Sequence, residues 1–126
     1  MTDSGNESAG YTMRRIYSEP QPNEGRRVLV DRLWPRGISK DDDAFDEWLK
    51  AIAPSSQLRI WYGHRAERNA EFAQRYRYEL QNDARAEALD QLRAWRREGP
   101  VTLLTASRDV EISHLPILVS VLTGGE

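Results

Sequence analysis

Two short apolar runs, far apart in the chain, most constrain what this sequence can fold into. The first lies in segment 26–34, which turns polar at Asp31; the second starts segment 101–107. Runs of aliphatic and β-branched residues like these are typical of buried strands. Because the stretch between them has helical character, we predict that the two strands are parallel and joined by a helical crossover, which makes the fold α/β.

Five segments have the apolar spacing of amphipathic helices, with capping residues near their starts or Gly or Pro near their ends. In the first of them the acidic run 41–43 is expected to be a solvated first turn. Its apolar face would consist of Phe45, Trp48, Leu49 and Ile52. The spacing predicts helices over residues 39–53, 56–62, 66–81, 83–98 and 113–122.

The N-terminal region supplies a third predicted strand. Residues 11–17 are aromatic and β-prone, and we expect them to lie at an edge of the sheet. Residues 1–10 are small and polar and are predicted to be a disordered extension, with Met13 as an alternative start. A chain of 126 residues suits one domain with a real core. We therefore expect a single small domain over residues 11–123, with a short, mostly parallel sheet packed by helices.

The composition excludes several classes of function. There is no cysteine, so disulfides, thiol nucleophiles and zinc–thiolate sites are ruled out. A net charge of −2 argues against nucleic-acid binding that is driven by an overall positive charge. No apolar run is long enough to span a bilayer, and the N-terminus lacks an apolar signal segment. We therefore expect a cytoplasmic protein with no membrane partner.

Polar residues follow both core strands and predict a ligand site. The residues that follow the first strand are Asp31, Arg32, Trp34 and Arg36, and those that follow the second are Ser107 and Arg108. Parallel α/β sheets bind ligands beyond the carboxyl ends of their strands. Arginines beside the N–H groups of the next helix start, at Ser113, suit a phosphate or carboxylate. We expect Arg32, Arg36 and Arg108 to hold the anion and Asp31 to orient an arginine.

The two histidines, His64 and His114, are the candidates for acid–base chemistry, because histidine titrates near neutral pH. We predict that His114 is the catalytic candidate, with a pKa lowered by the helix dipole, and that His64 binds the ligand. A metal site would need both histidines with Asp31 or Asp109, and no ligand spacing supports it. We expect neither a metal nor a cofactor, since Gly-rich phosphate loops and dinucleotide motifs are also missing.

Each candidate residue also has a structural interpretation. Asp31 and Arg32 suit ion pairs that hold the turn after the strand, and Trp34 suits the core. Ser107 suits a hydrogen bond to the backbone, because no base at a recognisable spacing would activate it as a nucleophile. Either histidine suits a structural hydrogen bond.

Several spaced motifs resemble the YeaO-like family of small bacterial proteins. They are Arg-Leu-Trp-Pro-Arg-Gly (32–37), Asp-Glu-Trp (46–48), Ala-Pro-Ser (53–55), Leu-Arg (58–59), Trp-Tyr-Gly-His (61–64) and Thr-Leu-Leu (102–104) with Ala106. The likeness covers roughly residues 13–122 and implies a compact α/β fold in a bacterial cytosol, with no established activity to transfer. The chain departs from the expected Asn-His-Ala at the last helix, where it has Ser113, His114 and Leu115.

Taken together, the residues favour a pocket for a small anion, such as a phosphate, nucleotide or carboxylate, and leave open whether it is catalytic. One alternative is a non-enzymatic interaction or nucleic-acid-associated module. Another is a metal-assisted hydrolase. Arginines that converge on one concave rim would favour the pocket, whereas dispersed arginines with exposed aromatic residues would favour a partner surface.

Overall fold

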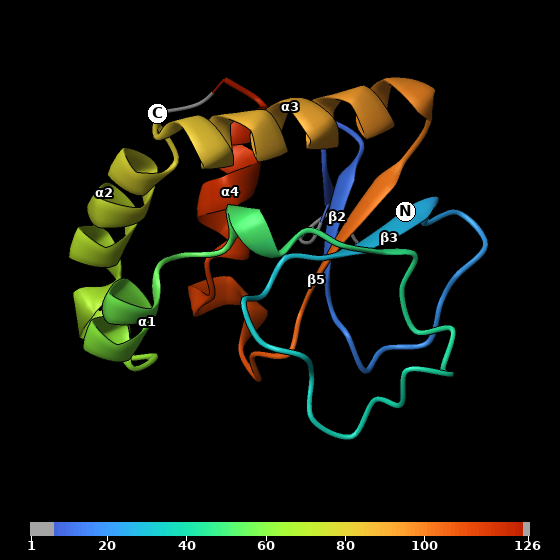
Figure 1. Cartoon of the computed structure of the whole chain (residues 1–126), viewed down its shortest axis with the longest axis horizontal. Coiled ribbons are helices and arrows are strands. Elements are labelled where there is room, and N and C mark those ends of the chain that lie inside the picture. The colour runs from blue at the N-terminus through green and yellow to red at the C-terminus, as the bar shows by residue number, and fades with distance from the viewer. Residues whose placement is uncertain (1–6, 125–126) are drawn as a thin grey trace.

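The computed structural model describes residues 7–124 and has an α/β fold (Figure 1). Its sheet has the strand order β1-β2-β5-β3-β4, in which β1 is antiparallel to β2 and all other neighbours are parallel. The predicted class, with a short and mostly parallel sheet, is confirmed. The strands are β1 (Glu7–Ser8), β2 (Tyr11–Arg15), β3 (Arg26–Leu29), β4 (Glu47–Trp48) and β5 (Val101–Thr105).

Strand β5 forms the centre of the sheet, although it is the last strand in the chain. Its Leu103 pairs with Met13 of β2 on one side and with Val28 of β3 on the other. All the residues of β5 are buried, as its aliphatic and β-branched composition predicts. The chain between β3 and β5 contains three α-helices, so the predicted helical crossover is confirmed.

The helices pack against one face of the sheet (Figure 1). Side chains of all four α-helices share one core cluster with Val28, Val101 and Leu103 of the sheet. Ser55 caps the first helix by accepting a hydrogen bond from the Leu58 N–H group at 3.1 Å. The helices are α1 (Ser56–Tyr62), α2 (Asn69–Glu79), α3 (Asp83–Glu98) and α4 (Leu115–Leu122), with one-turn 3₁₀ helices at η1 (Lys50–Ile52), η2 (Ala66–Arg68) and η3 (Val110–Ile112).

The other face of the sheet is covered by the loop that follows β3. A second core cluster joins Leu29 and Leu104 of the sheet to Phe45 and Trp48 from this loop and the short strand β4. Figure 1 shows the loop, in cyan to green, on the side of the sheet away from α1, α2 and α4. Alternate residues of the strands therefore face helices and loop, and both faces are buried.

The predicted helix over residues 39–53 is wrong. This segment contains turns, strand β4 and the single turn of η1. Trp48 pairs with Leu29 at the sheet edge, and its indole N–H donates to the Asp31 carbonyl at 2.7 Å. The apolar spacing does bury Phe45 and Trp48, but pairing with β3 and packing on the sheet override the local helical period.

Other boundaries also differ from the predictions. The strands are shorter than 11–17, 26–34 and 101–107, and β2 is not an edge strand because β1 pairs with it. Residues 7–8, expected in a disordered extension, form β1, whereas residues 1–6 of that extension lie outside the described range. Segment 66–81 divides into η2 and α2, and α4 begins at Leu115. Among residues 7–124, the structure has no helix long and apolar enough to cross a membrane.

A buried ion pair holds the loops beside β3. Arg27 and Glu24 are each 4% exposed, and one Arg27 Nη atom lies 2.5 Å from the Glu24 carboxylate. The remaining Arg27 donors reach the carbonyls of Ala44 and Ser18 at 2.8 and 3.1 Å. Because each guanidinium nitrogen has an acceptor, these interactions offset the desolvation penalty of burying the charge.

Replacing Arg27 with alanine is expected to destabilise the protein strongly. The change leaves the Glu24 carboxylate buried with one fewer partner and removes the hydrogen bonds to two loops. We expect it to lower the free energy of unfolding by about 3–5 kcal/mol. Arg65→Ala, which removes the exposed Arg65–Glu67 pair, is the control and should cost less than about 1 kcal/mol. Denaturant unfolding of both variants measures the difference, and similar small costs would show that the Arg27 network is not a structural anchor.

Candidate functional site

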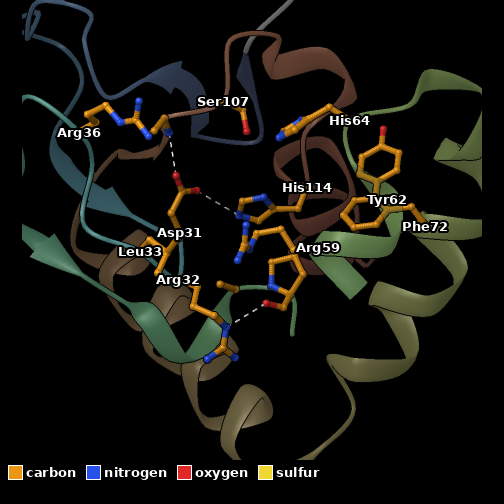
Figure 2. Close-up of a pocket in the computed structure, with 13 residues that line it drawn as sticks. Asp31, Arg32, Leu33, Arg36, Arg59, Tyr62, His64, Phe72, Ser107 and His114 are labelled. Carbon is orange, nitrogen blue, oxygen red and sulfur yellow. Dashed lines mark hydrogen bonds and ion pairs between the residues drawn. The ribbon is translucent and has the colours of Figure 1, made fainter. Parts of the chain in front are cut away.

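A pocket of about 410 Å³ opens beyond the carboxyl ends of β3 and β5 (Figure 2). Of the residues predicted for a site, the pocket lining brings together Asp31, Arg32, Arg36, His64, Ser107 and His114. Apolar and aromatic side chains, mainly from the segment before α1 and from helices α1 and α2, form the rest of the wall. The ends of the two strands therefore lie at one rim in the structure, as expected.

Asp31 joins the two strand ends at the floor of the pocket. Its Oδ2 accepts a hydrogen bond from the Ala106 N–H group at 2.8 Å, across from the end of β3 to the end of β5. Its Oδ1 is buried, has no hydrogen-bond partner within the described part of the chain, and lies 3.7 Å from His114 Nε2. Asp31 thus orients a backbone amide and a histidine, whereas the sequence predicted that it would orient an arginine.

His114 is buried beside this carboxylate, at the start of α4 (Figure 2). Its Nε2 lies 2.9 Å from the Val30 carbonyl, and the edge of its ring meets the Tyr76 ring at a centroid distance of 5.7 Å. Burial lowers the pKa of His114 below its usual range, although Asp31 and the Val30 carbonyl oppose that shift. The sequence predicted this direction but assigned it to the helix dipole, and burial is the larger cause.

Two residues at the start of α4, where free backbone donors were expected, do not offer a free N–H group. The Leu115 N–H group donates to Ser113 Oγ at 3.2 Å, and Pro116 has no N–H group. Leu115 is also completely buried. Neither residue therefore adds a backbone donor to the pocket.

Three arginines, Arg32, Arg36 and Arg59, line the pocket. Arg32 Nε donates to the Pro54 carbonyl at 3.3 Å. Within residues 7–124, none of the three has a carboxylate at ion-pair distance, unlike the paired arginines elsewhere in the chain. Arg59 was not among the site residues predicted from the sequence. The signal that could have indicated it was its position on the predicted helix that ends at Gly63, directly before the candidate His64.

Two predicted site residues lie outside the pocket lining. Trp34 is partly buried, and its ring contacts Phe45 and Trp48 of the second core cluster at centroid distances of 5.3 and 5.4 Å. Its indole N–H donates to the Ile38 carbonyl at 2.7 Å, as the structural interpretation of Trp34 implies. Arg108 is exposed on the loop after β5 and does not line the pocket.

One wall of the pocket is aromatic (Figure 2). The rings of Tyr62 and Phe72 stack with centroids 4.0 Å apart and nearly parallel planes. The Tyr62 hydroxyl donates to the Ile112 carbonyl at 2.6 Å, which fixes the wall to η3. His64 lies above Tyr62 at a centroid distance of 6.1 Å, and its backbone is left-handed with φ 57°. This unusual conformation, directly after the left-handed Gly63, turns the His64 ring toward the pocket.

In the described range there is no group of three His, Asp or Glu side chains placed to hold a metal ion. The acidic run 41–43 is exposed on the loop over the second face. The walls of the pocket carry the positive charge of its arginines. Its floor holds the Asp31 carboxylate, one oxygen of which already accepts a hydrogen bond, and the buried imidazole of His114. This arrangement is suited to holding an oxyanion.

Comparisons with known proteins agree with the motifs. The model of the family DUF488-N3i, described as the inactive DUF488-N3 subclade, matches residues 11–125. The uncharacterized protein Rv3073c of Mycobacterium tuberculosis is 47% identical over 110 residues, which are 87% of this chain and 91% of that protein. The uncharacterized protein YeaO of Escherichia coli is 37% identical over 106 residues, or 83% and 90% of the two chains. No solved structure matches the chain.

Removing the Asp31 carboxylate should loosen the junction of the two strand ends. Asp31→Ala leaves the Ala106 N–H group without its acceptor, at an expected cost of about 1–3 kcal/mol in the free energy of unfolding. Asp31→Asn keeps an acceptor oxygen and should cost clearly less. Denaturant unfolding compares the two variants, and equal costs would mean that this hydrogen bond does not hold the junction.

The buried His114 should make the protein less stable as the pH falls. Its pKa in the folded state is lower than in the unfolded state, so the unfolded chain takes up the proton first. Stability is therefore complete above the unfolded value of about 6.5 and declines below it, by at most about 1.4 kcal/mol per pH unit. Unfolding measured between about pH 7.5 and 5.5 should show a steeper decline for the wild type than for His114→Gln. If the stability of both proteins declined equally with falling pH, His114 would not be the cause of the decline.

Proposed function

Because this chain belongs to the DUF488-N3i family, whose subclade is described as inactive, we propose that its function is to bind a small anion and not to carry out a reaction. The proposed ligand is a phosphate, a nucleotide or a carboxylate, held in the pocket beyond β3 and β5. The observation that carries this proposal is the set of arginines in the lining that have no carboxylate partner in residues 7–124.

The charge of the lining supports the choice of an anion. The lining contains three guanidinium groups and one carboxylate, and Asp31 already uses one oxygen to accept a hydrogen bond from the Ala106 N–H group. A guanidinium presents paired donors that match the geometry of phosphate and carboxylate oxygens. In this proposal Arg32, Arg36 and Arg59 bind the anion, while Arg32 is positioned by the Pro54 carbonyl.

The remaining polar groups define the rim of the proposed site. The Ser107 N–H group is already used by Thr105 Oγ1 at 3.1 Å, which leaves the Ser107 hydroxyl as the group offered to a ligand. His64 also lines the pocket and is exposed, in a backbone conformation that costs energy for a residue other than glycine. Strain of this kind, on a side chain aimed into a pocket, supports a role for His64 in binding.

Convergence of the arginines favours this pocket over the two alternatives. An interaction or nucleic-acid-associated module would be expected to spread its arginines beside exposed aromatic residues. Tyr17 and Tyr78 are exposed, but neither lines the pocket with the arginines, and all four tryptophans are at least partly buried. A metal-assisted hydrolase would need a cluster of ligands, and the described residues hold none. A cytoplasmic location remains a prediction from composition.

Substituting a pocket arginine should weaken anion binding without destabilising the fold. Arg36→Ala and Arg59→Ala each remove a charged donor, which should weaken binding of phosphate or sulfate by about tenfold or more. Both side chains are exposed and unpaired with carboxylates in residues 7–124, so the free energy of unfolding should change by less than about 0.5 kcal/mol.

The measurement is a thermal-shift series with phosphate, sulfate, acetate and nucleoside monophosphates, followed by calorimetric titration of any anion that raises the midpoint. Arg97→Ala is the matched control, because Arg97 is an exposed arginine on α3 and does not line the pocket. Loss of binding in the control as well would indicate a general charge effect. If no anion in the series raises the midpoint of the wild type, the proposal is wrong.

A further inference from the structure

Resting on the proposed anion site, we infer that the pocket binds a doubly charged oxyanion together with a proton, and that His114 is the residue that accepts this proton. The inference comes from three features of the pocket floor: the hydrogen bond that occupies one nitrogen of His114, the unpartnered oxygen of Asp31 and the excess of positive charge in the walls. Each feature is independent of the others.

The hydrogen bond of His114 determines where a proton would be added. A carbonyl only accepts, so the Nε2 atom that lies 2.9 Å from the Val30 carbonyl carries the hydrogen in the neutral ring. The other nitrogen, Nδ1, makes no hydrogen bond to any residue in the range 7–124 and is the basic site. Because His114 lines the pocket, a proton accepted at Nδ1 places a positive charge beside the ligand.

The unpartnered oxygen of Asp31 favours the protonated ring. Oδ1 is buried without a donor in the described chain, which is costly for a carboxylate. An imidazolium whose Nε2 lies 3.7 Å away supplies the missing countercharge without any rearrangement. The carboxylate is itself fixed by the Ala106 N–H group, so it cannot turn away to solvent without breaking that bond.

Other groups around His114 keep its ring neutral while the pocket is empty. Burial disfavours the charged ring, and His64 acts in the same direction. From α2, the Tyr76 hydroxyl adds no charge, because burial raises the pKa of this phenol far above neutral pH. The three pocket arginines, Arg32, Arg36 and Arg59, bring no negative charge that would favour the charged ring. A bound anion reverses this balance, so anion and proton stabilise each other by the same factor.

The charge of the lining indicates which anions show this coupling. Three guanidinium groups against one carboxylate leave two positive charges, which a doubly charged oxyanion neutralises and a monocarboxylate does not. A dianion therefore lowers the electrostatic cost of protonating His114 more than a monoanion does. The inference assigns the pocket to phosphate-ester or sulfate-like ligands in preference to simple carboxylates.

Sulfate is the probe that tests this inference, because it remains doubly charged near neutral pH whereas phosphate changes its own protonation there. Calorimetric titration at about pH 7.5, 6.5 and 5.5 should show tighter binding as the pH falls, by up to about tenfold per pH unit. The same titrations in two buffers with different ionisation enthalpies should show uptake of a proton on binding. Acetate should bind more weakly and with less proton uptake.

The chain has only two histidines, which makes the source of the proton easy to identify. His114→Gln keeps a donor for the Val30 carbonyl but cannot accept a proton, so it should remove the pH dependence. His64→Gln removes the other histidine of the pocket and can weaken sulfate binding itself, but the part of the pH dependence that comes from His114 should persist in it. In the wild type, imidazole proton signals followed by NMR with and without sulfate should show one histidine titrating at higher pH when sulfate is present. This last measurement needs no variant and holds even if His114→Gln folds poorly.

The outcomes separate this inference from the proposed function. Sulfate binding that depends on Arg36 but takes up no proton would overturn the role of His114 and leave the anion pocket standing. Acetate binding without sulfate binding would overturn the assignment to dianions. If neither these ions nor phosphate bind, the proposed function fails and the inference fails with it.

Discussion

The pairing of β5 between β2 and β3 is the constraint on which the rest of the structure depends. This strand comes last in the chain but occupies the centre of the sheet, so the sheet is complete only when the segment after α3 has returned to it. Loop-closure entropy opposes such a distant pairing, and complete burial of the five residues of β5 compensates for it. Because the strands are parallel, this pairing also places the ends of β3 and β5 side by side, which creates the pocket.

The two faces of the sheet contribute differently to this pocket. The helical face is an ordinary core, and its helices α1 and α2 extend past the strand ends to supply Arg59, Tyr62 and Phe72. The loop face is closed by Phe45 and Trp48, which hold the turn that carries Arg32 and Arg36. The pocket thus lies where a rigid helical wall meets a turn that is fixed at both its ends.

Buried charge is used in two ways in this molecule. Around Arg27 every guanidinium nitrogen has an acceptor, so the network is closed and acts as scaffold. Around Asp31 and His114 the network is open, with one carboxylate oxygen lacking a donor inside the described residues. A closed network has nothing to gain from a further charge, whereas the open one gains a countercharge for Asp31 when His114 takes up a proton. Similar residue types, at two places beside the same strand, are suited to different tasks.

The sequence by itself determined the α/β class, the two buried core strands and the end of α1 at Gly63, because strand runs and caps are local signals. It also pointed to six of the residues that line the pocket, because the ends of parallel strands must meet at one edge. Only the tertiary structure decided the conformation of residues 39–53. Phe45 and Trp48 have helical spacing in this segment, but they pack on the sheet from a loop and a short strand. It also packed Trp34 against Phe45 and Trp48, and it placed Arg59 in the pocket lining and Arg108 outside it. Periodicity shows which side chains are buried, but the layer that buries them, and the direction of a side chain in a turn, depend on contacts between segments far apart in the chain.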